Sequence, residues 1–205
     1  MRRRATRVAI ISALAALSAS AAMASSASAS PVWKFNGTEL SGSETVVAET
    51  GASSLTIPGL TTTCKASVSM TISNSGGTGV ASVTSMSLSG CGTNGVCTVT
   101  KATAPNTPWS GTTLVSGGSY LVISGFDNRI TYGAAECAIE GLTIAYKGSV
   151  GGRFDNSSSK LIFDAASAAA TGASLKSIGS TKTGYDAEYE VHATGSKAGQ
   201  VLTLS

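Results

Sequence analysis

Apolar and polar residues alternate along most of the chain beyond residue 30. The clearest stretch is 64–72, where Cys64 and every second residue up to Ile72 are apolar and those between them are polar. A period of two predicts a half-buried antiparallel strand, because successive side chains point to opposite faces of a sheet. Residues 185–192 repeat the pattern with acids on the polar face. Further strands are predicted at 44–49, 54–57, 80–89, 96–101, 112–115, 119–124, 137–146, 160–163 and 200–204.

Turn residues separate these strands. Asn36-Gly37 predicts a two-residue hairpin, since a type I′ turn needs two residues that tolerate positive φ. Within 137–146 the apolar parity changes at Gly141, which predicts a β-bulge. The helical candidate is Asp164 to Ala173, an alanine-rich run without an apolar stripe, for which a loop is an equal alternative. About ten short strands with close turns predict an all-β sandwich, jelly roll or barrel, and we expect an antiparallel sandwich or jelly-roll-like domain.

Residues 1–29 have the parts of a cleaved secretory signal peptide of bacterial type. Four arginines occupy the first seven positions, Val8 to Met23 is uncharged and largely apolar, and Ala27-Ser28-Ala29 fits the small-residue rule for signal peptidase. We expect cleavage after Ala29, or as a second choice after Ala24, which leaves 30–205 as one domain. A spanning helix needs about 20 strongly apolar residues. We therefore expect a secreted, extracellular or cell-wall-associated protein with no stable membrane insertion after cleavage.

Removing this peptide changes the charge of the protein. The whole chain carries 14 Lys and Arg against 11 Asp and Glu, but four of the arginines belong to the first seven residues. The remaining domain is close to neutral, so it lacks the basic face that binding to nucleic acid or to an anionic membrane requires. Serine, threonine and glycine are abundant, yet the regular spacing of apolar residues argues against a disordered chain.

Four cysteines in an exported protein predict two disulfides. Cys91 and Cys97 flank the loop Thr93-Asn94-Gly95, whose glycine suits a three-residue hairpin, so these cysteines would face one another at a close cross-strand position. The preferred pairing is then Cys91–Cys97 with Cys64–Cys137. The alternative is Cys64–Cys91 with Cys97–Cys137. A zinc site is disfavoured, because there is one histidine and no C-x-x-C motif.

Few residues point to catalysis, and no cofactor or metal site is predicted. His192, the only histidine, lies on the polar face of its strand, and no Gly-x-Ser-x-Gly motif accompanies it. Asp186, Glu188 and Glu190 share that face; we interpret them as a solvated acidic stripe, with calcium binding or a glycosidase pair as alternatives. Trp33 and Trp109 are interpreted chiefly as packing residues and are also candidates for contacts with a partner at the surface.

Several segments together resemble a group of uncharacterised secreted proteins from high-GC Gram-positive bacteria. They are Trp33-x-x-Asn36-Gly37-x-x-Leu40, Leu55 to Leu60 leading to Cys64, Ser89-Gly90-Cys91 followed by Cys97-Thr98-Val99, and the ending Gly199 to Ser205. The resemblance implies export and a β-fold, and it implies no activity. A smaller likeness is to the secreted chromoprotein apoproteins, which are two-disulfide sandwiches.

These observations predict an exported, non-enzymatic β-protein with a structural or binding role, acting on an extracellular or cell-envelope partner. A first alternative is a secreted hydrolase that acts on glycan or cell-wall material through Asp and Glu residues. A second is a carrier of a small hydrophobic ligand. A concave site with acids from two strands would favour the hydrolase, and an apolar cavity would favour the carrier.

Overall fold

The structure is a computed structural model that describes residues 29–177 and 183–205. The predicted signal peptide up to residue 28, including the alternative cleavage site after Ala24, lies outside these ranges and stays a prediction. Within the described ranges, no helix has the length and apolar character needed to cross a membrane.

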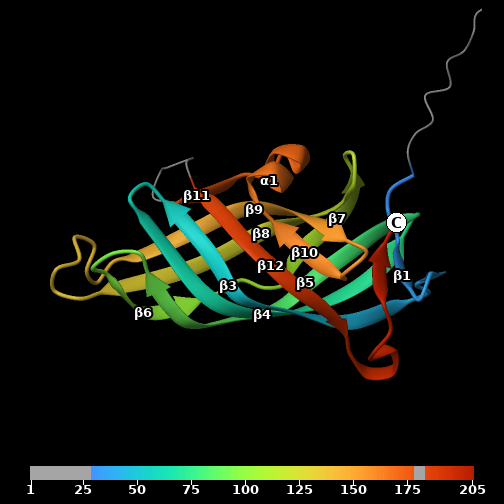
Figure 1. The fold of residues 1–205 in the computed structure, drawn as a ribbon, viewed down its shortest axis with the longest axis horizontal. Helices are drawn as coiled ribbons and strands as arrows, with labels where there is room; N and C mark the ends of the chain where they lie inside the picture. Colours follow the sequence, from blue (N-terminus) through green and yellow to red (C-terminus); the bar gives the residue numbers. More distant parts are fainter. Residues whose placement is uncertain (1–28, 178–182) are drawn as a thin grey trace, which may run out of the picture.

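The described residues form strands β1 to β13, one α-helix and one 3-10 turn (Figure 1). In chain order they are β1 (Trp33–Phe35), β2 (Thr38–Glu39), β3 (Ser43–Ile57), β4 (Leu60–Ser75), β5 (Thr78–Thr93), β6 (Thr98–Thr103), β7 (Trp109–Val115), β8 (Ser119–Gly133), β9 (Thr143–Asp155), β10 (Lys160–Phe163), α1 (Ala165–Thr171), β11 (Leu175–Ser177), β12 (Gly184–Ala193), η1 (Gly195–Lys197) and β13 (Leu202–Leu204).

Eight of these strands close into a barrel. Each pairs antiparallel with the next in the order β3, β4, β5, β7, β8, β9, β10 and β12. The ladder between β12 and β3, in which Tyr185 pairs with Leu55, completes the ring. The predicted all-β fold is confirmed, but a closed up-and-down barrel replaces the expected sandwich or jelly-roll form. Without the β8–β9 and β12–β3 ladders, strands β3 to β8 and strands β9 to β12 would form two separate sheets. These two ladders join them into one ring.

The long strands explain why the periodicity identified the fold class but misjudged several boundaries. In β4 every even-numbered residue from Thr62 to Ile72 is buried, so the alternation predicted there is confirmed. The predicted strands 44–49 and 54–57 are two halves of β3, joined across a bulge between Thr50 and Ser53. The bulge interrupts the period of two without ending the strand.

The prediction of a strand over 137–146 is wrong in its first half. Residues 134–142 form the connection between β8 and β9, and β9 begins only at Thr143. Gly141, with φ of 74°, belongs to this connection and not to a bulge. The bulge of this hairpin lies instead in β8, between Ser124 and Phe126, where the inward-facing positions change from odd to even numbers.

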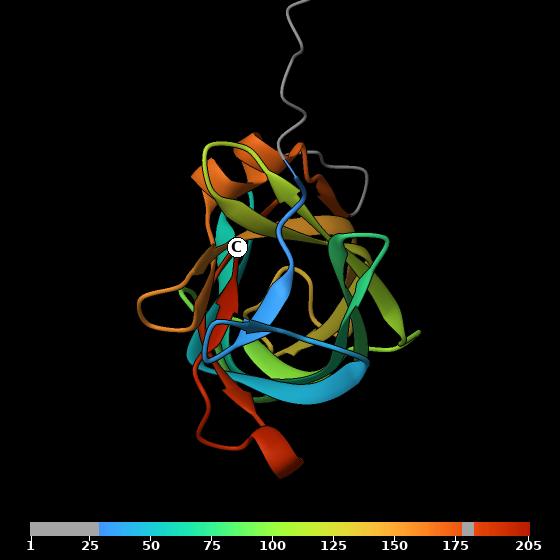
Figure 2. The ribbon, with the colours of Figure 1, turned by 90° about the vertical axis from the view of Figure 1, so that its right-hand side faces the viewer.

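A second sheet, formed by β13, β1 and β2, covers one end of the barrel (Figure 2). The predicted Asn36-Gly37 hairpin connects β1 to β2 and is confirmed, with φ of 48° and 80° at the two residues. Trp33 from β1 packs edge-on against Phe154 of the barrel, with 5.5 Å between ring centroids. Leu204 from β13 is fully buried beside them. This end of the barrel is therefore closed by apolar side chains.

The predicted helical candidate is confirmed as α1, although the helix is short. The Asp164 carboxylate caps it by accepting a 2.6 Å hydrogen bond from the backbone N–H of Ser167. Gly172 ends it in the left-handed conformation, with φ of 66°. The helix connects β10 to β11 on the outside of the barrel (Figure 1).

The disulfides join Cys64 to Cys91 and Cys97 to Cys137. The preferred pairing of Cys91 with Cys97 and of Cys64 with Cys137 is therefore wrong, and the alternative pairing is the one formed. β4 and β5 are paired neighbours, which places Cys64 beside Cys91. After Thr93 the chain leaves β5 and enters β6, which pairs with β8 instead of folding back on β5. Cys97 thereby meets the β8–β9 connection.

Candidate ligand pocket in the barrel wall

In the barrel wall, two short strands, β10 and β11, lie one after the other along the edge of β9 that faces β12. We call this place a shared wall position. β11 pairs with β9 up to Gly148, whereas β10 pairs with it from Gly152 onward. Residues 149–151 of β9 therefore pair with neither strand. On the opposite side β10 ends with Phe163 facing Ala187, so residues 184–186 of β12 lie beyond it. The ladder of the barrel is interrupted at this place.

Helix α1 crosses this interruption and packs directly on β9. A Cβ added to Gly151 would lie 1.9 Å from the Thr171 hydroxyl oxygen and 2.8 Å from the Thr171 Cβ. A Cβ on Gly148 would lie 2.1 Å from the Ser174 carbonyl oxygen. Because only glycine allows such approaches, these two positions hold the connection from α1 to β11 against the wall.

A pocket of about 220 Å³ lies between α1 and the interrupted wall. At the roughly 30 Å³ that a water occupies in the liquid, this is room for several waters or a small organic molecule. The pocket is lined by residues 149–151 and 184–186, by the helix alanines Ala165 and Ala168, and by the flanking Phe163, Asp164, Ala173, Leu175 and Thr183.

The pocket adjoins a hollow inside the barrel. Val150, Phe163 and Tyr185 line both spaces, so these three side chains separate the surface pocket from the interior. The hollow is lined only by apolar and aromatic residues, but its volume is about 20 Å³, close to the space of one water. The hollow itself is thus nearly filled, and of these two adjoining spaces the wall pocket is the one with room for a ligand.

Aromatic rings form the inner boundary of the pocket. The ring centroids of Phe126 and Tyr185 lie 5.1 Å apart, and those of Tyr185 and Phe163 lie 5.4 Å apart. The Tyr185 and Tyr189 hydroxyls are hydrogen-bonded to each other. Burial raises the pKa of both tyrosines, that of Tyr189 to about 12, so both rings are neutral under ordinary conditions.

Two carboxylates, Asp164 and Asp186, line the same pocket. The pKa of Asp164 is lowered, chiefly by the hydrogen bonds from Ser167 at the start of the helix. Burial raises the pKa of Asp186, and the negative charge of Asp164 raises it further. Within the described ranges, no salt bridge reaches either carboxylate. The pocket thus combines an apolar floor with two acids.

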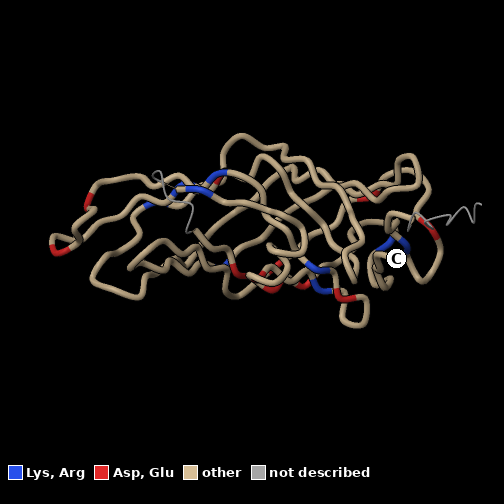
Figure 3. Tube along the Cα trace, turned by 90° about the horizontal axis from the view of Figure 1, so that it is seen from above, with Lys and Arg blue, Asp and Glu red and all other residues tan. Residues whose placement is uncertain are grey.

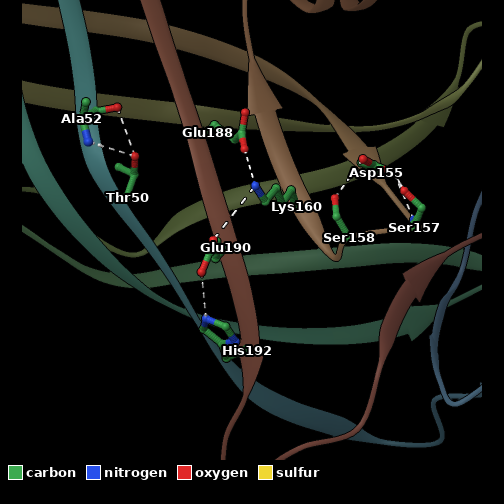
Figure 4. A network of polar contacts seen from close by, with 9 residues as sticks. All are labelled: Thr50, Ala52, Asp155, Ser157, Ser158, Lys160, Glu188, Glu190 and His192. Atoms are coloured by element: carbon green, nitrogen blue, oxygen red, sulfur yellow. Dashed lines mark hydrogen bonds and ion pairs between the residues drawn. The ribbon is translucent and has the colours of Figure 1, made fainter.

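The other members of the predicted acidic stripe lie outside the pocket, on the open outer face of β12 (Figure 4). Lys160 Nζ lies 2.5 Å from a Glu188 oxygen and 4.0 Å from a Glu190 oxygen. His192 Nε2 lies 3.9 Å from Glu190 Oε2. The His192 side chain is 60% exposed, so its predicted position on the solvent-facing side of the strand is confirmed. Lys160 partly balances these acids, which therefore serve as a hydrated surface pair.

Trp33 and Trp109 are 1% and 3% exposed, so their interpretation as packing residues is confirmed and the alternative, a contact with a partner at the surface, is wrong for both. Trp33 closes the end of the barrel, and its indole N–H donates a 3.0 Å hydrogen bond to the Val80 carbonyl. Trp109 lines the hollow and packs 5.1 Å from Phe126. β7 begins at Trp109, and the ring of this residue is turned inward.

A second wall position, between β5 and β8, is shared by β7 and β6. β7 pairs with β8 up to Ser124 and β6 pairs with it from Arg129, so the connection 104–108 crosses the residues between. Asp127, whose side chain is 6% exposed, holds this connection by accepting a 2.7 Å hydrogen bond from Asn106. Arg129 donates two further hydrogen bonds to the same carboxylate. Next to it, the fully buried Asn128 amide has no hydrogen-bond partner among the described residues.

Burial raises the pKa of Asp127, whereas the polar and charged groups next to its carboxylate lower it. Burial alone would raise this pKa, but the hydrogen bonds from Arg129 and Asn106, with the charges of Arg129 and Lys147, lower it overall. Lys147 Nζ lies 3.6 Å from the carboxylate. The carboxylate of Asp127 is therefore hydrogen-bonded and paired with cations, and its pKa is lowered, whereas the pKa of Asp186 is raised.

Comparisons with known proteins add no name to this arrangement. No protein-family model matches the chain, and no curated protein or solved structure shows significant similarity to it. The resemblance to secreted proteins of high-GC Gram-positive bacteria therefore stays a prediction. In the part of the chain that the structure describes, no group of three or more His, Cys, Asp or Glu residues could hold a metal ion.

Sequence reasoning found one of the two pocket acids and gave it another role. Asp186 was grouped with Glu188 and Glu190 because the three alternate along one strand, but β10 covers only the later part of β12. Asp164 was recognised as the residue before a helix and not as part of a site. The alanine-rich helix without an apolar stripe was the available indication, since such a helix packs through small side chains.

Proposed function

We propose that this chain is an exported binding protein that holds a small, largely apolar molecule in the pocket beneath α1. The observation that carries the proposal is the interrupted wall, where a pocket of about 220 Å³ adjoins the aromatic interior of the barrel. Antiparallel barrels of this strand number are wide enough to enclose side chains or one small ligand. Here the ligand would lie in the wall, since the hollow inside the barrel is nearly filled.

The other predicted roles receive less support from the geometry. A glycosidase needs two acids facing each other across a cleft. Glu49 on β3 faces Glu190 on β12 across a surface hollow of about 290 Å³, but the described residues that line this hollow include no aromatic ring, and Lys160 partly balances the acids of β12. Charges of both signs are scattered along the molecule (Figure 3), which supports the expectation that nucleic acid is not the partner. Export is supported by the two disulfides, which persist in oxidising compartments.

Binding of the neutral dye Nile red, followed by its fluorescence, tests this function. We expect saturable binding to the wild-type protein. Substitution Ala168→Phe places a ring in the pocket and should abolish it, because Ala168 lines the pocket from the helix. Ala165→Leu is a second filling variant, for use if the larger ring prevents folding.

Ala169→Phe is the matched control, since Ala169 lies next to Ala168 on the same helix but is exposed and does not line the pocket. It should bind the dye like the wild type. Circular dichroism and thermal melting establish that the variants are folded. Equal dye binding by Ala168→Phe and Ala169→Phe, in folded proteins, would overturn the proposed site.

A further inference from the structure

The two sides of the pocket differ in chemistry. Its inner side is made by Val150, Phe163 and Tyr185, which are shared with the apolar hollow. Its outer side carries Asp164 at the start of α1 and Asp186 on β12. A ligand that fills this space meets apolar and aromatic groups at one end and carboxylates at the other.

The carboxylates differ in how well the protein satisfies them. Asp164 accepts hydrogen bonds from Ser167, and the charge of Arg153 acts on it favourably. Asp186 is an exposed residue at the outer side of the pocket, and partial burial together with the negative charge of Asp164 raises its pKa. A cation placed between the two carboxylates would relieve the repulsion between them.

We propose that the ligand is an organic amine, with an apolar body against Val150, Phe163 and Tyr185 and a protonated nitrogen between Asp164 and Asp186. This assignment rests on the proposed function, because it names the chemical class for the same pocket. A bare metal ion is disfavoured as the occupant, because such ions require several oxygen ligands and the described lining of the pocket offers two carboxylates. The acids disfavour fatty acids and other anions, whose charge would add to the repulsion between the two carboxylates.

The strand geometry supports a role for Asp186 that Glu188 and Glu190 cannot share. Neighbouring positions on one face of a strand lie about 7 Å apart. β10 covers β12 from Ala187 onward and brings Lys160 to the two glutamates, whereas Asp186 lies just past the end of β10. Because β10 ends at Phe163, Glu188 and Glu190 lie near Lys160, whereas Asp186 lines the pocket.

The test compares octylamine with octanol, which have the same apolar chain and differ in the charge of the head group. Both are measured at neutral pH by displacement of Nile red and by isothermal titration calorimetry. We expect octylamine to bind more tightly. Asp186→Asn should weaken octylamine binding about tenfold, equivalent to about 1.4 kcal/mol, and leave octanol binding unchanged. Asp164→Asn should act in the same direction, and asparagine keeps the helix cap.

Glu140→Gln removes one negative charge from the exposed β8–β9 connection and serves as the control for net charge. It should not change the binding of either compound. Equal affinities for octylamine and octanol, unaffected by Asp186→Asn, would overturn the amine assignment while the binding function stands. If neither compound displaces the dye and Ala168→Phe has no effect on dye binding, the proposed function itself is overturned.

Discussion

The two shared wall positions solve the same structural problem in different ways. In each, two short segments replace one strand, and the chain between them crosses an interruption of the ladder. At β6 and β7 the crossing segment is held by Asn106, which donates to a carboxylate already bound by Arg129. At β10 and β11 the crossing segment is α1, which leaves a pocket lined by an acid that forms no salt bridge with any described residue.

An interruption of the barrel wall leaves a pocket only where the crossing segment does not fill it. Asp127 and Asp186 are both aspartates on strands next to an interruption, yet their pKa values shift in opposite directions. Cations and an amide reach the first carboxylate, whereas an acid lies near the second. The disulfide Cys97–Cys137 also fixes the start of β6, while no disulfide involves α1 or β11.

Removing the Cys97–Cys137 disulfide should have the largest effect. With Cys97→Ser and Cys137→Ser together, the free energy of unfolding should fall by about 4 kcal/mol, because the bridge spans 40 residues. Urea unfolding measures this, and hydrogen exchange should show β6 opening first. Cys64→Ser with Cys91→Ser is the matched pair, with a span of 27 residues and an expected loss of about 3.5 kcal/mol. Dye binding that disappears in the folded Cys97/Cys137 variant would mean that the two interruptions are not independent.

Gly151→Ala should destabilise the other interruption by up to about 3 kcal/mol, since its Cβ would collide with Thr171 and push α1 outward. Thermal melting should show the loss, and Nile red affinity should change with it. Gly92→Ala is the control, because no atom lies within 4 Å of a Cβ at that position. A Gly151→Ala protein with unchanged stability and dye binding would contradict the close packing of α1 on β9.

Asp127→Asn should lower the free energy of unfolding by roughly 2 kcal/mol at neutral pH, because charged hydrogen bonds from Arg129 are lost. The folded pKa of Asp127 is lowered, so its stabilising contribution is present above the unfolded pKa and disappears as pH falls through the folded value. The difference between wild type and variant should therefore shrink toward acidic pH. A difference that is independent of pH would show that the charge of Asp127 is not what holds the connection 104–108.

Asp186→Asn should have the smallest effect, with the opposite sign. Because the folded pKa of Asp186 is raised, the wild type loses stability relative to the variant as pH rises through that value. Without ligand, the variant should melt slightly higher at neutral pH and equally at pH well below the unfolded pKa. Saturating octylamine should reverse the order at neutral pH. A lower melting temperature for the ligand-free variant would mean that Asp186 has a stabilising partner in the protein.

Local sequence patterns were sufficient for some of these features. The alternation of β4, the Asn36-Gly37 turn and the aspartate before α1 each depend on residues close together in the chain. They predicted an all-β fold and a candidate helix, because side-chain period and turn chemistry are local properties. The sequence also supplied the four cysteines and left two disulfide pairings open.

Only the tertiary structure decided which segments meet. The choice between a sandwich and a barrel depended on β12 pairing with β3, and the disulfides depended on β6 pairing with β8, contacts between distant segments that no local pattern specifies. Trp109 was buried by the same long-range assembly. The pocket arises because β10 is too short to cover the whole of β12, so Asp186 joins Asp164 while Glu188 joins Lys160. Residue types therefore determined the strands and their faces, and the closure of the barrel determined where a pocket formed.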